Sequence, residues 1–394
     1  MPPLQRLPTR RGGIASLPQK GESVLDKKVI ALYFPQFHRI PENDAWWGEG
    51  FTDWTNVRQG TPQYPGHRQP RVPLNDNYYD LSDVNVIRWQ AELAKQYGIG
   101  GWAIYHYWFD DNVQLLETPK ELILHNKDID IPFCLTWANE SWARRWEGND
   151  KQILLQQTHT PTKEKWKTHF EYLLPYFKDS RAIRIDGKIL FQIYRPHLID
   201  KVGDMLRYWR ELAREAGIGE LYFMAIKSFD FPDNSILDEF DGVLLFQPHA
   251  ATNSKKGKGM QVYLENLLRH LPEKWVEKLR SVRTKNRTGC KIYSYQKIWD
   301  IIHSETFSYK DKAVFQMGFM GWDNTARYRN KATIYDGCTP EIFAENFKKL
   351  YDKANGFVFI NAWNEWAEGT YLEPDTDHGY GYLEAIKAIT KERG

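Results

Sequence analysis

Three glutamates, Glu365, Glu368 and Glu373, stand within nine residues of sequence in the segment NAWNEWAEGTYLEPD, residues 361–375, which also holds two tryptophans. An apolar run, residues 356–360, directly precedes this segment and has the composition of a buried strand. Crowded carboxylates repel one another, and burial beside aromatic rings raises the cost of their charge. We expect carboxyl groups in such a place to perform chemistry, or else to point into water.

The spacing of the first two glutamates suits cleavage of a glycosidic bond. That reaction uses one protonated and one ionised carboxyl group, held about 5 to 10 Å apart. Glu365 and Glu368 meet this need if the chain turns helically after the strand, because residues i and i+3 share a face. Their repulsion and the rings of Trp363 and Trp366 are expected to push the two pKa values apart. The alternative is an exposed pair on a loop, which the strand-end position and the flanking Trp and Asn residues disfavour.

The composition favours a neutral ligand with hydrogen-bonding groups. The 53 basic and 51 acidic residues leave a formal net charge of +2, which gives no electrostatic case for nucleic acid or for an anionic membrane surface. Aromatic residues make up 15% of the chain, and many stand beside Asn, Gln, His, Asp or Glu. Flat rings among hydrogen-bonding groups suit sugars, although a Trp-rich core gives the same composition.

Other classes of protein are disfavoured. Cys134, Cys290 and Cys338 are far apart and lack metal-site spacing, so we predict no disulfide framework, no metal and no cofactor. No apolar stretch approaches the roughly 20 residues that cross a bilayer, so no membrane insertion is expected. Residues 1–27 have no apolar core of a secretory signal and are interpreted as a flexible leader of a cytoplasmic protein. The oligomeric state is left open.

Eight apolar runs that end in polar and aromatic residues predict a parallel sheet, because strands buried on both faces are apolar throughout. The runs span residues 29–38, 100–108, 131–140, 189–197, 221–229, 242–249, 315–324 and 356–366. Amphipathic helices are predicted between them, including residues 82–98, 200–217 and 339–356, with Ser82 and Thr339 as N-caps and Gly98, Gly217 and Gly356 as C-terminal stops. Eight strand–helix units predict an α/β fold, a (β/α)₈ TIM barrel.

The barrel is expected to be one domain, residues 28–394, with long loops after the first strand (residues 39–81) and the sixth strand (residues 250–314). A doubly wound open sheet is the competing fold. It is disfavoured because the chain has neither a GxGxxG turn after a first strand nor a GxxxxGK[ST] motif. A barrel places functional side chains at the C-terminal ends of its strands, where the polar residues gather here.

Candidate substrate-binding residues therefore lie at the strand ends and in the first long loop. Because strand side chains alternate in direction, we expect about half of the strand-end residues to face the pocket. Glu140 binds a sugar hydroxyl, serves as a third carboxylate, or caps the helix after the third strand. His106 is either a structural group, which is the commoner role of a lone strand-end histidine, or a hydrogen-bond donor to the ligand. The candidates are Tyr33, Gln36, Trp46, Trp47, Glu49, Trp54, Tyr105, His106, Trp137, Asn139, Glu140, Tyr194, Gln247, His249, Trp322, Asp323, Asn361, Trp363, Asn364 and Glu373. The loop residues Trp46, Trp47, Glu49 and Trp54 form a wall or roof of the pocket, or else pin the loop to the rim.

The acidic triplet Asp375–Asp377, DTD, matches the DxD motif with which many glycosyltransferases hold a divalent metal and a nucleotide diphosphate. Three-residue matches are weak, and no glycine-rich nucleotide-binding turn is near. We therefore interpret it as an acidic loop.

Five longer motifs together resemble the WbsX family, often labelled glycosyltransferase WbsX, whose members are similar to glycoside hydrolase family 99 of endo-α-mannosidases and mannanases. The motifs are VIALYFPQFH, WWGEGFTDW, YHYW, TWANESW and NAWNEWAEGTYLEP, and the resemblance covers most of residues 28–390. It implies that Glu365 and Glu368, in NEWAEGT, are the catalytic pair of a retaining mechanism. Glu365 would act as a base on the sugar's own 2-hydroxyl, giving a 1,2-anhydro sugar, and Glu368 as the acid and then the base.

The leading functional hypothesis is a retaining glycoside hydrolase that cleaves internal α-linkages of a mannose-like bacterial surface polysaccharide. The first alternative is a nucleotide-sugar-dependent glycosyltransferase of O-antigen, lipopolysaccharide or capsule biosynthesis. The second is a glycan-binding barrel without catalysis, which predicts carboxylates too far apart or one of them held in a salt bridge.

Overall fold

The computed structural model describes residues 27–143, 152–228, 231, 233–258, 289–309 and 311–391. The predicted leader, apart from Lys27, and residues 259–288 of the second long loop lie outside the described residues.

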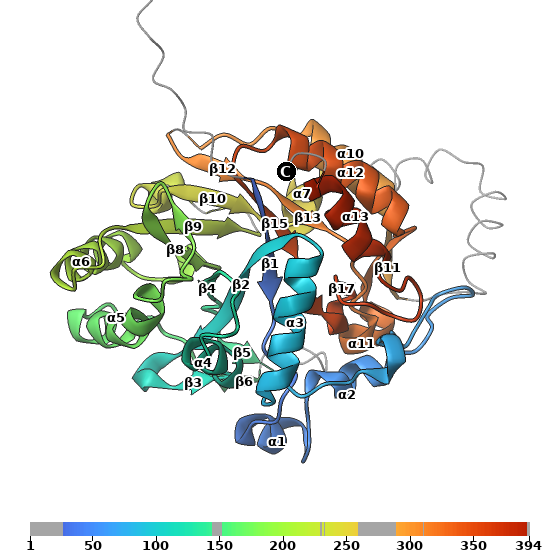
Figure 1. Ribbon diagram of the computed structural model, residues 1–394, viewed down its shortest axis with the longest axis horizontal. Helices are drawn as coiled ribbons and strands as arrows, with labels where there is room; N and C mark the ends of the chain where they lie inside the picture. Colours follow the sequence, from blue (N-terminus) through green and yellow to red (C-terminus); the bar gives the residue numbers. More distant parts are fainter. Residues whose placement is uncertain are drawn as a thin grey trace, which may run out of the picture.

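A parallel sheet curls into a barrel, as predicted (Figure 1). Its strands are β1 (Lys28–Tyr33), β2 (Ile99–Trp108), β4 (Phe133–Trp137), β8 (Lys188–Ile193), β9 (Leu221–Lys227), β10 (Gly242–Leu245), β12 (Ala313–Phe315), β13 (Met317–Phe319) and β15 (Phe357–Asn361). From β1 to β12 each strand pairs in parallel with the next, and β15 pairs in parallel with both β13 and β1. All eight apolar runs form strands of this barrel.

The seventh run closes the barrel in two halves. β12 pairs with β10, and β13 pairs with β15, with the single residue Gln316 between the two halves. The N–H group of Phe359 donates to the carbonyl oxygen of Gln316 over 3.0 Å, so the seam stays hydrogen-bonded where the strand is interrupted.

Helices cover the outside of the barrel. The longer ones are α3 (Val84–Gln96), α4 (Thr118–His125), α5 (Lys163–Phe177), α6 (Val202–Glu215), α10 (Tyr295–Ser304), α12 (Pro340–Lys353) and α13 (Gly381–Lys391). Figure 1 shows α5 and α6 on one flank and α10, α12 and α13 on the other. Among the described helices, none has the length and apolar composition that crossing a bilayer requires.

Short elements fill the connections. The short helices are α1 (Pro41–Trp47), α2 (Asp53–Arg58), α7 (His249–Asn253), α11 (Thr325–Tyr328) and the 3₁₀ turns η1 (Leu74–Asp76), η2 (Asp110–Asn112), η4 (Pro196–Leu198), η5 (Asn234–Leu237), η6 (Arg329–Lys331) and η7 (Trp366–Glu368). The short strands are β3 (Gln114–Leu115), β5 (Trp142–Ala143), β6 (Ile153–Leu155), β7 (Arg184–Ile185), β11 (Lys291–Ser294), β14 (Thr333–Asp336), β16 (Asn364–Glu365) and β17 (Thr370–Tyr371). Between β9 and β10, the described residues contain η5 in place of the α-helix that a regular unit has.

The predicted helix ends are mostly confirmed. Thr339 caps α12 by accepting a hydrogen bond from the N–H of Ile342, and Gly98, Gly217 and Gly356 have the positive φ angles of C-terminal stops. The prediction of Ser82 as an N-cap is wrong. Asp83 caps α3 instead, because the Ser82 hydroxyl donates to Asp80 over 2.7 Å.

The helices bury large rings against the barrel. Trp209 of α6 is fully buried, with its ring 5.5 Å from that of Phe191 on β8, and its indole N–H donates to the carbonyl of Trp166 on α5 over 2.9 Å. Burying one such side chain contributes about 2 to 3 kcal/mol. These contacts fix the strand ends that carry the site.

Candidate active site

A cavity of about 370 Å³ opens at the C-terminal ends of the barrel strands. All the barrel strands except β9 and β12 contribute to it through their last residues or the loops that follow. It is lined by Phe34, Gln36, Trp47, Tyr105, Tyr107, Ala138, Glu140, Ser141, Trp142, Ala143, Leu154, Tyr194, Arg195, Phe246, His249, Trp322, Asn324, Arg327, Tyr328, Glu365 and Glu368. The lining is thus rich in rings interleaved with hydrogen-bonding and charged groups, as a sugar requires.

The predicted helical turn between the two glutamates is present. β15 leads through β16 into the 3₁₀ turn η7, so Glu365 and Glu368 fall on one face, because residues i and i+3 eclipse in a 3₁₀ helix. Gly369 ends the turn with φ +63°, and a Cβ atom there would lie 2.9 Å from the backbone nitrogen of Asp323. Only glycine fits that conformation and that approach.

One buried guanidinium holds both glutamates. Arg327 of α11 donates from Nη1 to Oε1 of Glu368 over 2.8 Å, and from Nη2 to Oε1 of Glu365 over 3.0 Å. Nη2 also donates to Oδ2 of Asp53, from α2, over 2.7 Å. Because both bonds reach one planar group, the two glutamate oxygens lie within about 8 Å of each other. This upper limit is compatible with the separation that glycosidic cleavage needs.

The two glutamates have raised pKa values. Burial is the largest cause for each, and the charge of Arg327 opposes it. The nearby carboxyl groups add to the rise, because a single guanidinium faces three of them. The pKa of Glu365 is raised further than that of Glu368, and the Glu368 side chain is the more exposed of the two, at 21% against 8%. The two pKa values therefore differ, as expected, but both lie above the ordinary value of a glutamate.

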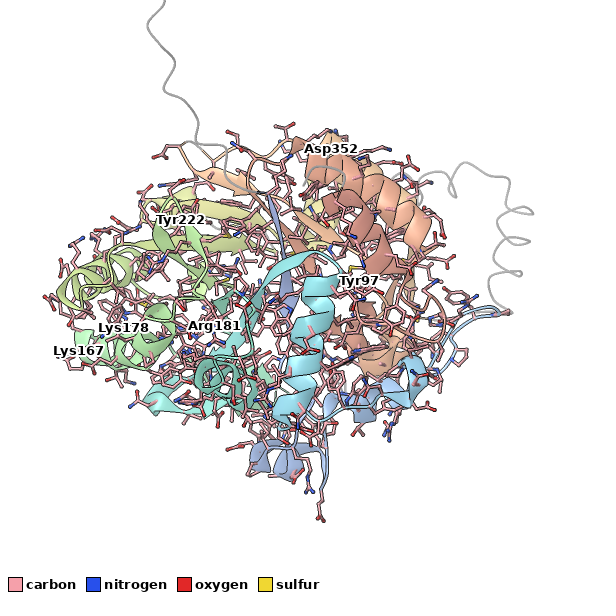
Figure 2. All side chains as sticks on the ribbon, in the orientation of Figure 1. Tyr97, Lys167, Lys178, Arg181, Tyr222 and Asp352 are labelled. Atoms are coloured by element: carbon pink, nitrogen blue, oxygen red, sulfur yellow. The ribbon has the colours of Figure 1, made fainter. Side chains whose placement is uncertain are left out.

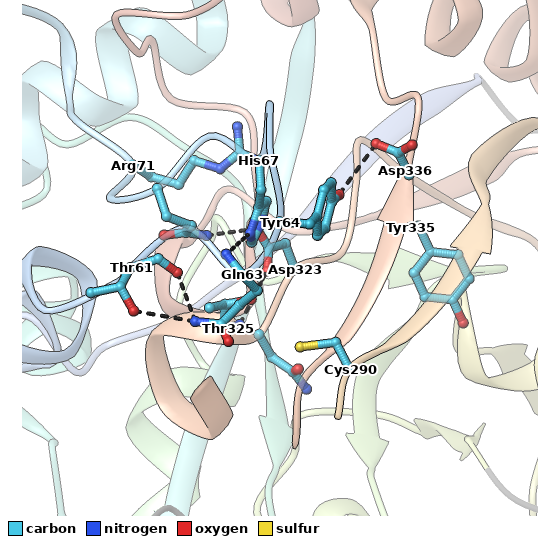
Figure 3. Close-up of polar contacts among 12 residues, drawn as sticks. Thr61, Gln63, Tyr64, His67, Arg71, Cys290, Asp323, Thr325, Tyr335 and Asp336 are labelled. Atoms are coloured by element: carbon cyan, nitrogen blue, oxygen red, sulfur yellow. Dashed lines mark hydrogen bonds and ion pairs between the residues drawn. The ribbon is translucent and has the colours of Figure 1, made fainter. Parts of the chain in front are cut away.

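Asp323 supports the turn from behind. Its N–H donates to the carbonyl oxygen of Glu368 over 2.7 Å, and its carboxylate accepts from the N–H and hydroxyl of Thr325, the first residue of α11. Figure 3 shows the same carboxylate beside His67, whose Nε2 lies 2.8 Å away, and Arg71 lies at 3.7 Å. Although burial raises the pKa of Asp323, the hydrogen bond with His67 and the charge of Arg71 hold it below its usual value.

The opposite wall holds a second ion pair. Nε and Nη2 of Arg195 donate to Oε1 of Glu140 over 3.0 and 2.8 Å. Asn139 fixes the Arg195 backbone, accepting from its N–H over 2.8 Å and donating to its carbonyl over 2.9 Å. His249 packs between Phe246 and Trp322, and burial, together with the charge of Arg195, lowers its pKa to about 4. It is therefore neutral near pH 7.

Of the sequence-predicted site residues, the structure brings nine to the cavity. They are Gln36, Trp47, Tyr105, Glu140, Tyr194, His249, Trp322, Glu365 and Glu368.

Three strand residues face the helices instead, because side chains alternate along a strand. Tyr33 donates to Gln90 of α3 over 2.7 Å. His106, between the lining residues Tyr105 and Tyr107, lies 2.9 Å from His169 of α5. The indole of Trp137 donates to the Trp108 carbonyl over 3.0 Å.

Four predicted amides join the strand ends and do not line the cavity. Asn364 binds both backbone groups of Phe34, over 2.7 and 2.9 Å, which ties the end of β15 to the end of β1. Asn361 donates to the carbonyl of Gln247 over 2.9 Å, and the side chain of Gln247 accepts from the N–H of Ala251 over 3.1 Å. Asn139 serves Arg195 as described.

The remaining candidates also lie away from the cavity, besides Asp323 behind the turn. Trp46 packs on the lining residue Trp142. Trp54 donates to the carbonyl of Tyr79 within the first loop over 2.8 Å, and its ring lies 5.5 Å from that of Trp366 in η7, so it pins the first loop to the turn after β15. Glu49 is exposed, and Trp363 is buried against Trp102.

Glu373 is separated from the other two glutamates. Its carboxyl accepts hydrogen bonds from Tyr79, Gln90 and Trp366 over 2.8, 2.6 and 2.7 Å. Burial raises its pKa to about 7 despite these donors. It belongs to a buried network on the far side of the turn.

The Asp375–Asp377 triplet forms local structure. Asp375 accepts from the Tyr371 hydroxyl over 2.7 Å and from the N–H of Asp377 over 3.0 Å, and Asp377 pairs with Arg71 at 3.2 Å. Within the described part of the chain, no group of three or more His, Cys, Asp or Glu residues is arranged to hold a metal ion.

The family model described as Glycosyltransferase WbsX matches residues 29–386. The chain belongs to the WbsX family.

Two curated relatives of this WbsX chain come from Xanthomonas campestris pv. campestris and are both described as "Uncharacterized protein WxcX". The protein of strain B100 is 33% identical over 402 residues, which cover 98% of this chain and 54% of the relative. That of strain ATCC 33913 is 34% identical over 375 residues, with 93% and 50% covered. The WbsX chain thus spans about half the length of these relatives.

Solved structures show the same fold. A "Glycoside hydrolase-like protein" superposes on the WbsX chain with a TM-score of 0.55 at 12% identity, covering 96% of this chain and 97% of that one. The GH99 endo-alpha-mannosidase from Bacteroides thetaiotaomicron gives a TM-score of 0.50 at 15% identity, covering 93% and 98%. The WbsX chain therefore shares the barrel fold of these two structures.

Sequence reasoning missed several residues of this WbsX site, chiefly Arg327, Asp53, Arg195 and Tyr107. Asp53 stands in the motif WWGEGFTDW, and Tyr107 in YHYW, so a search of polar residues within the family motifs would have found both. Arg327 lies four residues after Asp323 in a polar loop, and nothing local indicates its carboxylate partners, which come from α2 and β16–η7. Arg195 follows Tyr194 directly at a strand end, which was a usable signal.

Proposed function

We propose that this chain is a retaining glycoside hydrolase acting within an α-linked, mannose-like bacterial surface polysaccharide. The observation that carries the proposal is the pairing of Glu365 and Glu368 with one guanidinium at a ring-lined cavity. Two carboxyl groups so placed can act together on one glycosidic linkage. The fold shared with an endo-α-mannosidase supports the substrate class.

In the proposed reaction, the sugar's own 2-hydroxyl is the nucleophile. Glu365 takes the proton of that hydroxyl as its oxygen attacks the anomeric carbon, and Glu368 gives a proton to the leaving glycosidic oxygen. The product is a 1,2-anhydro sugar. Water then opens this ring at the anomeric carbon, with Glu368 taking the proton of water and Glu365 returning its proton to O2. Two inversions give net retention.

The proton must lie on Glu368 when the substrate is bound. In the free site, burial raises the pKa of Glu365 further than that of Glu368. The two carboxyl groups share Arg327 and therefore titrate as a pair, so the location of a single proton depends on what each group contacts. A sugar hydroxyl that donates to Glu365 stabilises its ionised form and favours the proton on Glu368.

Replacement of each glutamate tests the proposal. Glu365→Gln and Glu368→Gln are each expected to lower kcat by about 10³-fold or more, since both remove a proton-transfer group. Glu49→Gln, at a side chain 91% exposed, is the matched control and is expected to keep full activity. Turnover is measured as oligosaccharide release from a panel of α-linked polysaccharides. Near-normal turnover by both variants would refute the catalytic assignment.

A nucleotide-sugar-dependent glycosyltransferase of O-antigen or lipopolysaccharide biosynthesis is the second candidate, and the description of the matching family favours it. Calorimetric titration with nucleoside diphosphate sugars separates the two. Tight binding with glycosyl transfer to an acceptor supports the transferase, whereas oligosaccharide release without nucleotide binding supports the hydrolase.

A glycan-binding barrel without catalysis is the third candidate. It predicts a carboxylate held in a salt bridge, and both glutamates do pair with Arg327. However, three carboxyl groups share that single positive charge and the pKa values of both glutamates stay raised, which favours retention of a transferable proton. Glycan binding by the wild-type protein without any turnover would support this candidate.

A further inference from the structure

A second hollow, of about 450 Å³, lies on the flank of the barrel beside α3. Its exposed lining comes from the end of the first long loop, from α3 and from the segment before α13. We name it the α3 flank site and define it by Asn75, Asp76, Asn77, Tyr78, Trp89 and Tyr380. Its volume lies in the range of small-molecule sites.

The turn η7 separates this hollow from the catalytic cavity. Trp366 lines the α3 flank site, while its neighbours Glu365 and Glu368 line the catalytic cavity. The Trp366 indole donates to the buried carboxyl of Glu373, which forms the floor of the α3 flank site. The two cavities are thus distinct and share one wall.

The rings of the α3 flank site are held in place from outside it. Tyr380 is 37% exposed and stacks on Tyr97 at 5.8 Å and 11°; Figure 2 marks Tyr97 at the end of α3. Tyr78 packs at 3.9 Å against the guanidinium of Arg58. Rings that are already fixed lose little conformational entropy when a ligand binds.

The polar side chains at the rim of the α3 flank site do not stabilise the fold through hydrogen bonds. Asn75, Asp76 and Asn77 are exposed, and their side chains make no hydrogen bonds within the described part of the chain. They supply amide donors and carbonyl or carboxylate acceptors next to Trp89 and the two tyrosines. Rings that meet the C–H face of a sugar, beside groups that bind its hydroxyls, are the two requirements of carbohydrate recognition.

The charge of the α3 flank site decides between classes of ligand. No lysine, arginine or histidine lines the hollow, and its acidic groups are Asp76 and the buried Glu373. Phosphates, nucleotides and uronic acids carry negative charge, which the exposed Asp76 would repel, and the guanidinium of Arg58 lies on the Tyr78 ring and does not line the hollow. A neutral sugar meets no such penalty.

We propose that the α3 flank site binds a neutral hexose unit of a polysaccharide, outside the catalytic cavity. The α3 flank site holds a distant part of the same polysaccharide molecule while the catalytic cavity cleaves it. This proposal shares with the proposed function only the class of ligand, a polysaccharide. Binding at the α3 flank site does not require turnover, so the two proposals fail separately.

Affinity electrophoresis through gels containing yeast α-mannan or dextran tests the proposal, with polygalacturonate as the anionic comparison. All proteins carry Glu365→Gln, so that the probe is not consumed. Trp89→Ala with Tyr380→Ala is expected to weaken retardation by the neutral polysaccharides at least about fivefold, as loss of aromatic anchors does. Tyr208→Ala, which removes a partly buried ring of α6 near Lys163, is the matched control and should change nothing.

A second variant, Asn75→Gly with Asn77→Ala, touches only exposed rim groups and should weaken retardation without affecting folding, because glycine suits the φ of +58° at position 75. Migration of both double variants like the Tyr208→Ala control would overturn the proposal. So would equal retardation by polygalacturonate, or no retardation by either neutral polysaccharide. Absence of turnover by the protein with Glu365 restored refutes the hydrolase alone and leaves the α3 flank site standing.

Discussion

The N–H of Asp323 donates a hydrogen bond to the carbonyl oxygen of Glu368 over 2.7 Å. Since the carboxylate of Asp323 also accepts from Thr325 at the start of α11, this one residue links the catalytic turn to the helix that carries Arg327. The position of both glutamates relative to their shared guanidinium therefore depends on a residue outside the cavity.

Asp323→Asn is expected to lower kcat by about 10- to 100-fold with a smaller change in KM, because it disturbs the position of the reacting groups and not the rings that bind sugar. Steady-state kinetics on the released oligosaccharides measure this. Asp377→Asn is the control, since Asp377 pairs with Arg68 and Arg71 and does not contact the turn. A change confined to KM would contradict the positioning role.

Arg327→Met tests the electrostatic role of the shared guanidinium. Arg327 opposes the burial that raises the pKa values of Glu365 and Glu368, so its removal raises both values further. The acid limb of the kcat/KM profile, where a carboxyl must ionise, is expected to move to higher pH. Arg39→Met, at an exposed arginine, should leave the profile unchanged. A shift of the acid limb to lower pH would contradict the account.

Lys120 is a buried lysine whose effect on stability depends on pH. Its Nζ lies 5.2 Å from the centre of the Tyr172 ring, and burial lowers its pKa from 10.5 to about 7. Between these two values the unfolded chain binds a proton that the folded protein does not, so stability rises with pH over this window. Below about pH 7 both states are protonated, and the full cost of burying the charge remains.

Lys120→Met is therefore expected to stabilise the protein at pH 7 by on the order of 2 to 4 kcal/mol and to remove this part of the pH dependence. Urea unfolding at pH 7 and pH 10 measures both effects. Lys95→Met, at an exposed pair with Asp130, should change stability by less than about 1 kcal/mol. An equal gain at both pH values would show that packing, and not charge, is responsible.

The barrel was predictable because each strand is buried on both faces and so appears in the sequence as a continuous apolar run. The same property hides the direction of each side chain. Tyr105 and Tyr107 face the cavity and His106 faces α5, yet all three end one run. The interruption of the seventh strand at Gln316 follows from pairing with two different neighbours, which no local pattern reports.

The catalytic pair was predictable from its own turn, because Glu365 and Glu368 are three residues apart and their geometry is local. The role of Arg327 was not predictable, because it depends on contacts with Glu365 and Asp53, which lie 38 and 274 positions away in the sequence. Glu373 shows the same limit, because its proximity in sequence to the pair conceals a side chain bound to Tyr79 and Gln90 behind the turn.

The stereochemistry of the first-formed product tests the central claim most directly. Proton NMR of an α-linked mannan, recorded in the first minutes of hydrolysis, reports the anomer released before mutarotation. Cooperation of Glu365 and Glu368 through a 1,2-anhydro sugar predicts that the α anomer forms first. Initial appearance of the β anomer would contradict the account.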